Sequence, residues 1–251
     1  MDQLSIARLD YEPIRIQMRC ESDVERVFRV RAAQKEMWTT QFVESIQPGG
    51  LFYDVGANVG PYTLIAAARG IATVAIEPGA ANYARLVENV FLNNFDERVT
   101  SFPVALGNGT GLTWFDYSDL SPGGASHVMG SPRKVYFHRQ LVQVWKLDDL
   151  ITTFHLIVPT HMKIDVDGNG DVEMAVLEGM AETLKNERLV GLMVEIPLRH
   201  EEAIKTKLAE SGWAPAERFD ERGGQKIGNI CYYRFERVAV AAEPALAGAA
   251  A

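Results

Sequence analysis

Short runs of apolar, β-branched and aromatic residues alternate with helical stretches along most of this chain of 251 residues. The run LFYDV at 51–55 leads through a glycine-punctuated turn into the helical stretch TLIAAAR, and TVAIEP at 73–78 precedes a helical run over 80–93. Three further strands are predicted, at 99–106, 161–166 and 189–196. This alternation is typical of a parallel sheet covered on both faces. We therefore predict an α/β, Rossmann-like fold with a mostly parallel sheet of about seven strands and helices on both faces.

The regions outside this alternation suggest three parts. Residues 1–50 read as a lead-in, with short strands that form a hairpin before a helix over 23–46. The main domain is expected over 51–237, and the Ala-rich segment 238–251 is expected to be a disordered tail. Within the domain, the irregular stretch 107–147 is a candidate lid or substrate loop, in which His127 could contact a substrate.

Charge and composition exclude several classes of protein. A net charge of −8 argues against a nucleic-acid partner, because binding a polyanion requires a basic surface. The two cysteines, Cys20 and Cys231, have neither zinc-site nor disulfide-framework spacing. We find no secretion signal and no apolar run long enough to cross a membrane, so a cytoplasmic location is expected. Oligomeric state is left open.

The turn Asp54–Gly60 lies between a strand and a helix, where a parallel sheet places its ligand crevice. Its glycines, Gly56 and Gly60, allow a tight turn and a close approach to a ligand. A nicotinamide dinucleotide site would require G-x-G-x-x-G, but Asn58 stands at the place of the middle glycine. The Asp54 carboxylate at the strand's end would repel a pyrophosphate and attract the ammonium of a methionine group. We therefore favour S-adenosylmethionine as the cofactor.

Two later strand ends complete the predicted cofactor site. Glu77 follows Asp54 by 23 residues and ends the next strand, where a carboxylate can accept hydrogen bonds from ribose hydroxyls. Ala105, in the segment Val104–Leu106, lies where apolar side chains would flank an adenine.

Several segments occur in the order found in the FkbM family of methyltransferases, which this chain resembles from about Phe52 to Ile196. They are FYDVGANVGPYTLIA, VAIEP, NYARLVENVFLNN, VALGN, WKLDDL, KIDVDG, AVLEGM and LMVEI. The resemblance implies a class I methyltransferase fold and methyl transfer from S-adenosylmethionine, most often to a hydroxyl oxygen of a natural product or a carbohydrate. The implied cofactor positions are Asp54, Gly56, Asn58, Gly60 and Glu77. Lys163, Asp165 and Glu195 match strand ends that line the active site, and Ser126 matches a recurrent segment more loosely.

The loop after KIDVDG departs from the family pattern. Residues Asn169–Val172 intervene before the expected glutamate-led helix. The loop 165–173 also has the acidic spacing of an EF-hand, but Val176 stands where a bidentate glutamate is required and the preceding segment reads as a strand. A divalent ion on Asp165, Asp167 and Asp171 is an alternative. We favour a helix-capping turn and predict no metal site.

Methyl transfer to a hydroxyl requires an aligned acceptor and a group that takes its proton. Asp165 is our first choice for this base, followed by Glu195 and then His200. We expect Lys163 to point to the opposite face from Asp165, away from the site. The acceptor is expected to be a small molecule or glycan. The alternatives are an NAD(P)-dependent Rossmann oxidoreductase, although the chain lacks a Tyr-x-x-x-Lys pair, and a non-catalytic binding module with a calcium-like loop.

Overall fold

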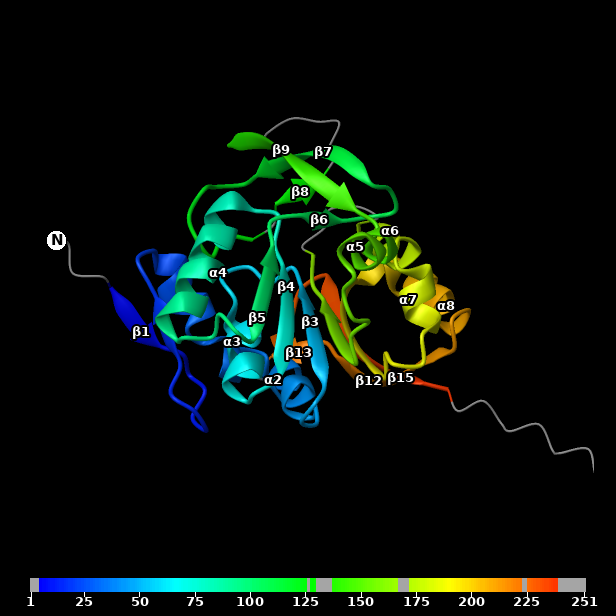
Figure 1. The fold of residues 1–251 in the computed structure, drawn as a ribbon, viewed down its shortest axis with the longest axis horizontal. Coiled ribbons are helices and arrows are strands. Elements are labelled where there is room, and N and C mark those ends of the chain that lie inside the picture. Colours follow the sequence, from blue (N-terminus) through cyan, green and yellow to red (C-terminus); the bar gives the residue numbers. More distant parts are fainter. Residues whose placement is uncertain (1–4, 126, 130–136, 167–171, 223–224, 239–251) are drawn as a thin grey trace, which may run out of the picture.

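A central sheet of seven strands organises the protein in the computed structural model (Figure 1). The structure describes residues 5–125, 127–129, 137–166, 172–222 and 225–238. The order across the sheet is β12-β15-β11-β10-β3-β4-β5, in which β11, β10, β3, β4 and β5 pair in parallel and β15 pairs antiparallel with both β11 and β12, so that β15 alone of these seven strands is reversed. The strands are β3 (Leu51–Val55), β4 (Ala72–Ile76), β5 (Val99–Phe102), β10 (His161–Ile164), β11 (Gly191–Pro197), β12 (Trp213–Phe219) and β15 (Ile230–Arg237). The predicted α/β, mostly parallel seven-stranded sheet is confirmed.

Helices cover both faces of this sheet, as Figure 1 shows. One group is α2 (Met37–Glu44), α3 (Pro61–Ala68) and α4 (Ala80–Leu92), and the other is α5 (Leu147–Phe154), α6 (Val172–Glu178), α7 (Ala181–Lys185) and α8 (Glu201–Ala209). Side chains alternate between the two faces along β3: Phe52 packs in the core of the first group, and Tyr53 and Val55 pack in that of the second. The sheet is therefore buried on both sides, as its apolar strands require.

The lead-in forms a hairpin and a broken helical segment. Strands β1 (Ile6–Arg8) and β2 (Gln17–Arg19) pair antiparallel, which confirms the expected hairpin. The single helix expected over 23–46 is wrong: the segment divides into a π-helical turn, η1 (Glu25–Arg29), then α1 (Ala32–Lys35) and α2. One break is stabilised by Asp10, whose carboxylate accepts hydrogen bonds from the first backbone amides of α1. The next lies at Glu36, whose backbone leaves the helical region.

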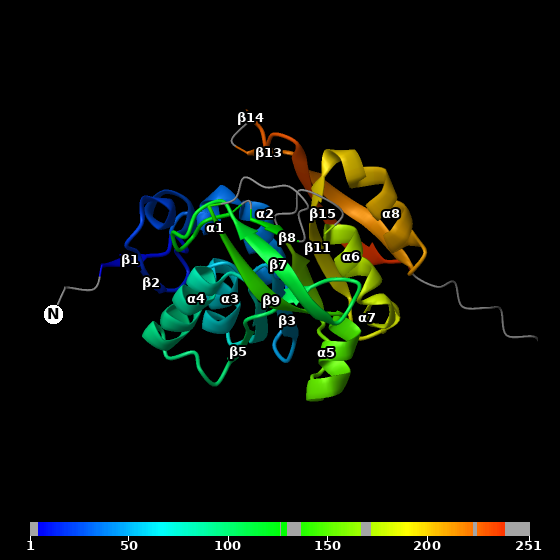
Figure 2. The same cartoon turned by 90° about the horizontal axis from the view of Figure 1, so that it is seen from above.

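A second, four-stranded sheet covers the carboxyl ends of the parallel strands (Figures 1 and 2). Its order is β6-β9-β7-β8, with β6 (Ala105–Leu106), β7 (Gly111–Tyr117), β8 (Val128–Met129) and β9 (His138–Trp145). The single strand predicted over 99–106 is therefore wrong, because the chain leaves the main sheet near Pro103, which has no N–H to donate to a ladder. Much of the stretch expected to be an irregular lid is this sheet.

The carboxyl-terminal part of the domain carries the remaining short elements. These are η2 (Leu198–His200), β13 (Glu221–Arg222) and β14 (Gln225–Lys226). The predicted tail, apart from Val238, and the centre of the loop 165–173 lie outside the described residues. No helix among the residues described is long and apolar enough to cross a membrane.

Candidate functional site

The loop that joins β3 to α3 depends on left-handed backbone at three positions. Gly56, Asn58 and Gly60 have φ angles of 78°, 55° and 90°. The amides of Gly56 and Ala57 donate to the Ile76 carbonyl at 2.9 and 3.1 Å, which fixes the loop against the end of β4. A Cβ added at Gly56 would lie 1.8 Å from the carbonyl oxygen of Asp165. Gly56 is therefore required for β10 to end directly against the loop.

Asn58 connects this loop to Glu77, at the end of β4. The Glu77 carboxylate accepts a hydrogen bond from the Asn58 amide at 2.9 Å and another from the Gly79 amide at 2.8 Å. Asparagine tolerates the left-handed conformation better than most residues, which accounts for a non-glycine residue here. Each carboxylate oxygen retains acceptor capacity beyond these two bonds. Glu77 therefore lies at the predicted place, held in one orientation.

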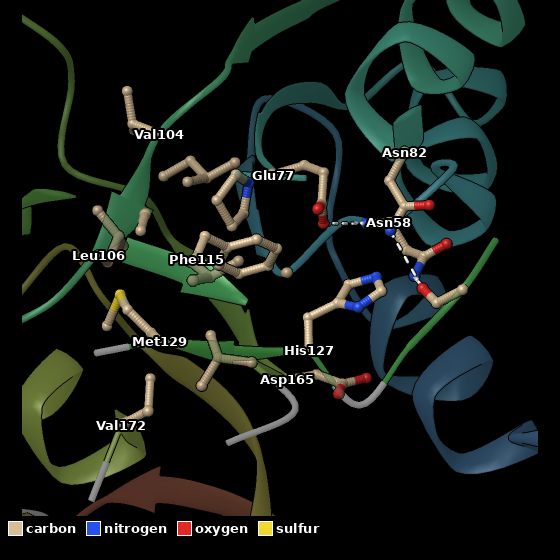
Figure 3. Close-up of a pocket in the computed structure, with 17 residues that line it drawn as sticks. Asn58, Glu77, Asn82, Val104, Leu106, Phe115, His127, Met129, Asp165 and Val172 are labelled. Carbon is tan, nitrogen blue, oxygen red and sulfur yellow. Dashed lines mark hydrogen bonds between the residues drawn. The ribbon is translucent and has the colours of Figure 1, made fainter. Parts of the chain in front are cut away.

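A cavity opens beside these two residues (Figure 3). Val104, Leu106, Phe115 and Met129 form an apolar side, and Ala105 also lines the cavity, as the sequence predicted. The other side carries Asn58, Glu77, Asn82, His127 and Asp165. An apolar wall facing a few fixed polar groups is the usual composition of a nucleoside-sized ligand site.

His127 belongs to the polar side of this cavity. Burial lowers the pKa of its imidazole, which is therefore neutral at pH 7. The ring packs against Phe115 and Tyr117 with centroids 5.5 and 5.0 Å apart. The sequence suggested that His127 could contact a substrate; the structure places it in the first cavity and not in the second, which is described below.

A short segment, Pro122–Ala125, closes one edge of the cavity, and we call it the strap. Side-chain amides of Asn58 and Asn82 donate to the Gly124 carbonyl at 2.8 and 3.1 Å, and the Gly123 amide donates to Asn82 at 2.8 Å. From the lead-in, Arg29 donates through Nε to the Gly123 carbonyl at 2.8 Å. The sequence marked this stretch only as part of the candidate lid or substrate loop 107–147, and nothing in it indicated these distant partners.

A second, more open cavity of about 880 Å³ meets the first. Gly56, Asn58 and Asp165 line both cavities, so they form the junction. The other polar groups of the second cavity come from separate parts of the chain: Arg29, Lys35, Glu36, Tyr62, Lys163, Glu195 and Tyr232. Glu195 and Asp165, predicted as the catalytic acids, therefore face the same cavity.

Tyrosine hydroxyls hold two of the carboxylates in this second cavity. The Tyr232 hydroxyl donates to Glu195 at 2.5 Å, and the Tyr62 hydroxyl donates to Glu36 at 2.8 Å. Burial raises the pKa of both tyrosines, so they remain protonated donors at neutral pH. His200, the third candidate base, is not among the residues that line either cavity and accepts a hydrogen bond from Arg199.

Lys163 lies inside the site, contrary to the expectation that it points away from Asp165. Its ammonium nitrogen lies 2.9 Å from Oδ2 of Asp165. The expectation was wrong because side chains two residues apart on an extended strand share a face, whereas immediate neighbours alternate. Burial lowers the pKa of Lys163, but the carboxylates of Asp165 and Asp54 raise it by more, so the amine remains charged.

Asp54 lies beneath the loop and does not line either cavity. It is fully buried, accepts a hydrogen bond from the Thr63 hydroxyl at 2.7 Å, and has the Lys163 ammonium 3.7 Å away. Burial raises its pKa, and Lys163 opposes this shift. The sequence placed this carboxylate at the ligand. The structure instead gives it a lysine partner of the same chain.

The loop 165–173 is the segment for which the sequence left a divalent ion as an alternative. Among the residues that the structure describes, no group of three or more His, Cys, Asp or Glu side chains could hold a metal ion. Asp167 and Asp171, which the EF-hand alternative needs, lie outside the described residues.

Comparison with known proteins places this geometry among methyltransferases. The model of the methyltransferase FkbM domain matches residues 54–220, which is more than half of the chain. No curated protein matches the chain in sequence.

Solved structures of methyltransferases share the fold. A methyltransferase FkbM from Methylobacillus flagellatus KT aligns with a TM-score of 0.50 at 19% identity, covering 74% of this chain and 43% of its own. A precorrin-6y C5,15-methyltransferase from Geobacter metallireducens GS-15 aligns with a TM-score of 0.50 at 10% identity, covering 83% and 92%. A putative tRNA (m1A22) methyltransferase from Streptococcus pneumoniae has a TM-score of 0.49 at 14% identity, covering 81% and 71%. The chain thus spans less than half the length of the first of these proteins, and the likeness concerns the fold alone.

Proposed function

Because this chain belongs to the FkbM methyltransferase family, we propose that it transfers a methyl group from S-adenosylmethionine to a hydroxyl oxygen of a small molecule or glycan. One observation carries the proposal: a cavity with an apolar wall and a few polar groups, and a second cavity lined by acids, meet at Gly56, Asn58 and Asp165. Methyl transfer requires two ligands to meet at one point, with the attacking oxygen in line with the bond that breaks.

The residues of the first cavity fit an adenosyl ligand. Glu77 is oriented by two backbone amides and retains lone pairs for ribose hydroxyls. Val104, Ala105 and Leu106 offer an apolar wall for an adenine. The left-handed backbone at Gly56 and Gly60 makes the tight turn into α3, whose first amides would suit the carboxylate of the methionine portion. Asp54 would act on this portion indirectly, through the loop that it underlies and through Lys163.

In the proposed reaction, S-adenosylmethionine supplies an electrophilic methyl carbon at the junction. The acceptor oxygen bonds to this carbon as the carbon–sulfur bond breaks, and the hydroxyl proton passes to a carboxylate. Asp165 lies at the junction and is the proposed base. Glu195, held by the Tyr232 hydroxyl, is the proposed second acceptor of hydrogen bonds from the substrate.

Calorimetric titration of the full chain tests the cofactor. Micromolar affinity for S-adenosylmethionine and for S-adenosylhomocysteine is expected. Binding of NAD(H) instead would identify a Rossmann oxidoreductase, and binding of calcium alone would identify a non-catalytic module. Either result would overturn the proposal.

Mass spectrometry with isotopically labelled methyl donor tests the acceptor. The panel contains hydroxylated metabolites, oligosaccharides, amine-bearing analogues of both, and tRNA. The net charge of −8 is our ground for expecting no transfer to tRNA. Labelling of the amines or of tRNA, with the hydroxyl compounds unlabelled, would contradict the proposed O-methylation.

A further inference from the structure

Lys163 is a buried lysine between two acids, and it takes no part in the proposed transfer of the methyl group or the proton. Its side chain is 2% exposed, and its ammonium nitrogen lies 2.9 Å from Asp165 and 3.7 Å from Asp54. Burying an ammonium costs free energy unless carboxylates or hydrogen-bond acceptors compensate for it. An apolar side chain would fill this space at a lower cost in free energy. The buried charge therefore indicates a role in the site.

The backbones of the two elements that carry these acids are locked together. The Asp165 amide donates to the Val55 carbonyl at 3.0 Å, and a Cβ at Gly56 would collide with the Asp165 carbonyl at 1.8 Å. These contacts fix where β10 ends relative to the cofactor loop. They do not fix the Asp165 carboxylate, which can still rotate about its side-chain bonds.

Lys163 supplies that missing constraint. Within the part of the chain that the structure describes, its ammonium is the only hydrogen-bond partner of the Asp165 carboxylate, which is bound through Oδ2. Among the described residues Oδ1 has no such partner, and Asp165 lines both cavities. On its other side the ammonium faces Asp54, beneath the loop that borders the first cavity.

The charges of this group favour a cationic neighbour. With both acids ionised, the two carboxylates and the ammonium sum to one negative charge, with Lys163 and Asp54 buried and Asp165 19% exposed. A sulfonium at the junction carries one positive charge. A site of low effective dielectric strengthens the attraction between the two.

We propose that Lys163 is a positioning residue: its ammonium holds the Asp165 carboxylate at the junction of the cavities and links it to Asp54 under the cofactor loop. The inference rests on the proposed function, because it takes the junction as the point of methyl transfer. Asp165 would touch the acceptor, and Lys163 would act only through Asp165.

A titration of the Asp165 side chain tests this role without any acceptor. The protein is labelled with carboxyl-¹³C aspartate, and the Asp165 signal is the one that Asp165→Asn removes. Other ionisable groups face the pair: Asp54, Glu36, Tyr62, Glu195 and Tyr232. Each variant is therefore compared with wild type at the same ionic strength.

Replacing the ammonium should move the titration in a defined direction. In Lys163→Met, the midpoint of the Asp165 signal should rise by about 1 to 2 pH units, because an adjacent cation favours the ionised carboxylate. In Lys163→Arg, which retains the charge, it should rise by less than half as much. An unchanged midpoint in a folded Lys163→Met protein would overturn the inference.

Two controls keep the test decisive. Asp54→Asn removes a carboxylate near Asp165 and keeps the lysine. The midpoint of the Asp165 signal should therefore fall or stay unchanged in this variant, whereas it should rise in Lys163→Met. Lys163→Met leaves the carboxylates of Asp54 and Asp165 without their cation. The double variant Lys163→Met/Asp54→Asn also removes the Asp54 charge, and it is used if Lys163→Met alone does not fold.

Calorimetry with S-adenosylhomocysteine separates this inference from the proposed function. If wild type does not bind the ligand, the proposed function fails. If wild type binds the ligand but the midpoint of the Asp165 signal is the same in wild type and Lys163→Met, only the positioning role fails.

Discussion

The two cavities of this protein are built in opposite ways. The first draws most of its lining from the ends of β3 and β4 and from the strands just beyond them, and its wall is largely apolar. The second collects six acidic or basic side chains from the lead-in, β10 and β11, namely Arg29, Lys35, Glu36, Lys163, Asp165 and Glu195. Under the proposed function, the cofactor cavity is thus built largely from neighbouring strand ends, whereas the acceptor cavity is assembled from distant segments of the chain.

The largest expected effect comes from Gly56→Ala, a substitution at the junction of the two cavities. Gly56→Ala puts a methyl group 1.8 Å from the Asp165 carbonyl at a φ of 78°, so backbone must shift on both sides of the junction. We expect the free energy of unfolding to fall by about 3 kcal/mol or more, and adenosyl affinity to fall beyond about 100-fold.

The matched control for this change is Gly60→Ala. Its Cβ meets only Cδ1 of Leu86, at 2.4 Å, which is the end of a flexible side chain. The φ of 90° still imposes strain of about 1 to 2 kcal/mol. Denaturant unfolding and calorimetry of both variants check the difference, and equal losses would show that the contact with Asp165 has no special cost.

Asp165→Asn should impair methyl transfer and leave cofactor binding nearly unchanged. The amide retains the shape of the junction but cannot take a proton, so methyl transfer should fall by about 10²- to 10⁴-fold while adenosyl affinity changes little. Initial rates with labelled methyl donor, measured beside Glu195→Gln, assign the base. If Glu195→Gln shows the large loss and Asp165→Asn the small one, the roles are exchanged.

A smaller effect, confined to the first cavity, is expected from Glu77→Gln. Loss of the charge weakens hydrogen bonds from ribose hydroxyls, so affinity for S-adenosylhomocysteine should fall by about 10-fold. The 2′-deoxy analogue lacks one of these hydroxyls and should lose less on the same substitution. Equal losses for both ligands would mean that Glu77 acts only through the loop amides that it binds.

The smallest effect on either cavity is expected from His161, at the opposite end of β10. Burial lowers the pKa of His161 to about 4. Because the unfolded chain binds this proton more readily, stability should be full above pH 6.5 and should fall by up to about 3 kcal/mol as the pH drops to 4.

Thermal unfolding across this pH range checks the His161 prediction. His161→Gln should flatten this part of the profile, with adenosyl affinity at pH 7.5 unchanged. A variant that keeps the full slope would assign the pH dependence to other groups.

The contrast between the cavities also explains what the sequence could predict. Strand ends and their glycines follow local rules, so the parallel sheet and the positions of Glu77 and Ala105 could be inferred from short segments. The partners of the strap, Arg29 and Asn82, are set by tertiary packing and leave no local signal. The same holds for the division of 99–106 between two sheets, since its apolar pattern runs on past Pro103.

The error at Lys163 and the interpretation of Asp54 have a different origin. Both residues could be placed at strand ends from the sequence, but the sequence could not show that their charges compensate each other. Asp54 was therefore assigned to a ligand's ammonium, although an ammonium of the chain itself lies 3.7 Å away. Pairwise charge compensation between neighbouring strands depends on register, which β3 and β10 fix by pairing Asp54 with Lys163.

The strap connects the lead-in to the edge of the first cavity. Asn58 and Asn82 hold the Gly124 carbonyl at the edge of the first cavity, and Arg29 holds the adjoining Gly123 carbonyl. A substitution at Arg29, in the lead-in, can therefore reach the edge of this cavity through the backbone of the strap.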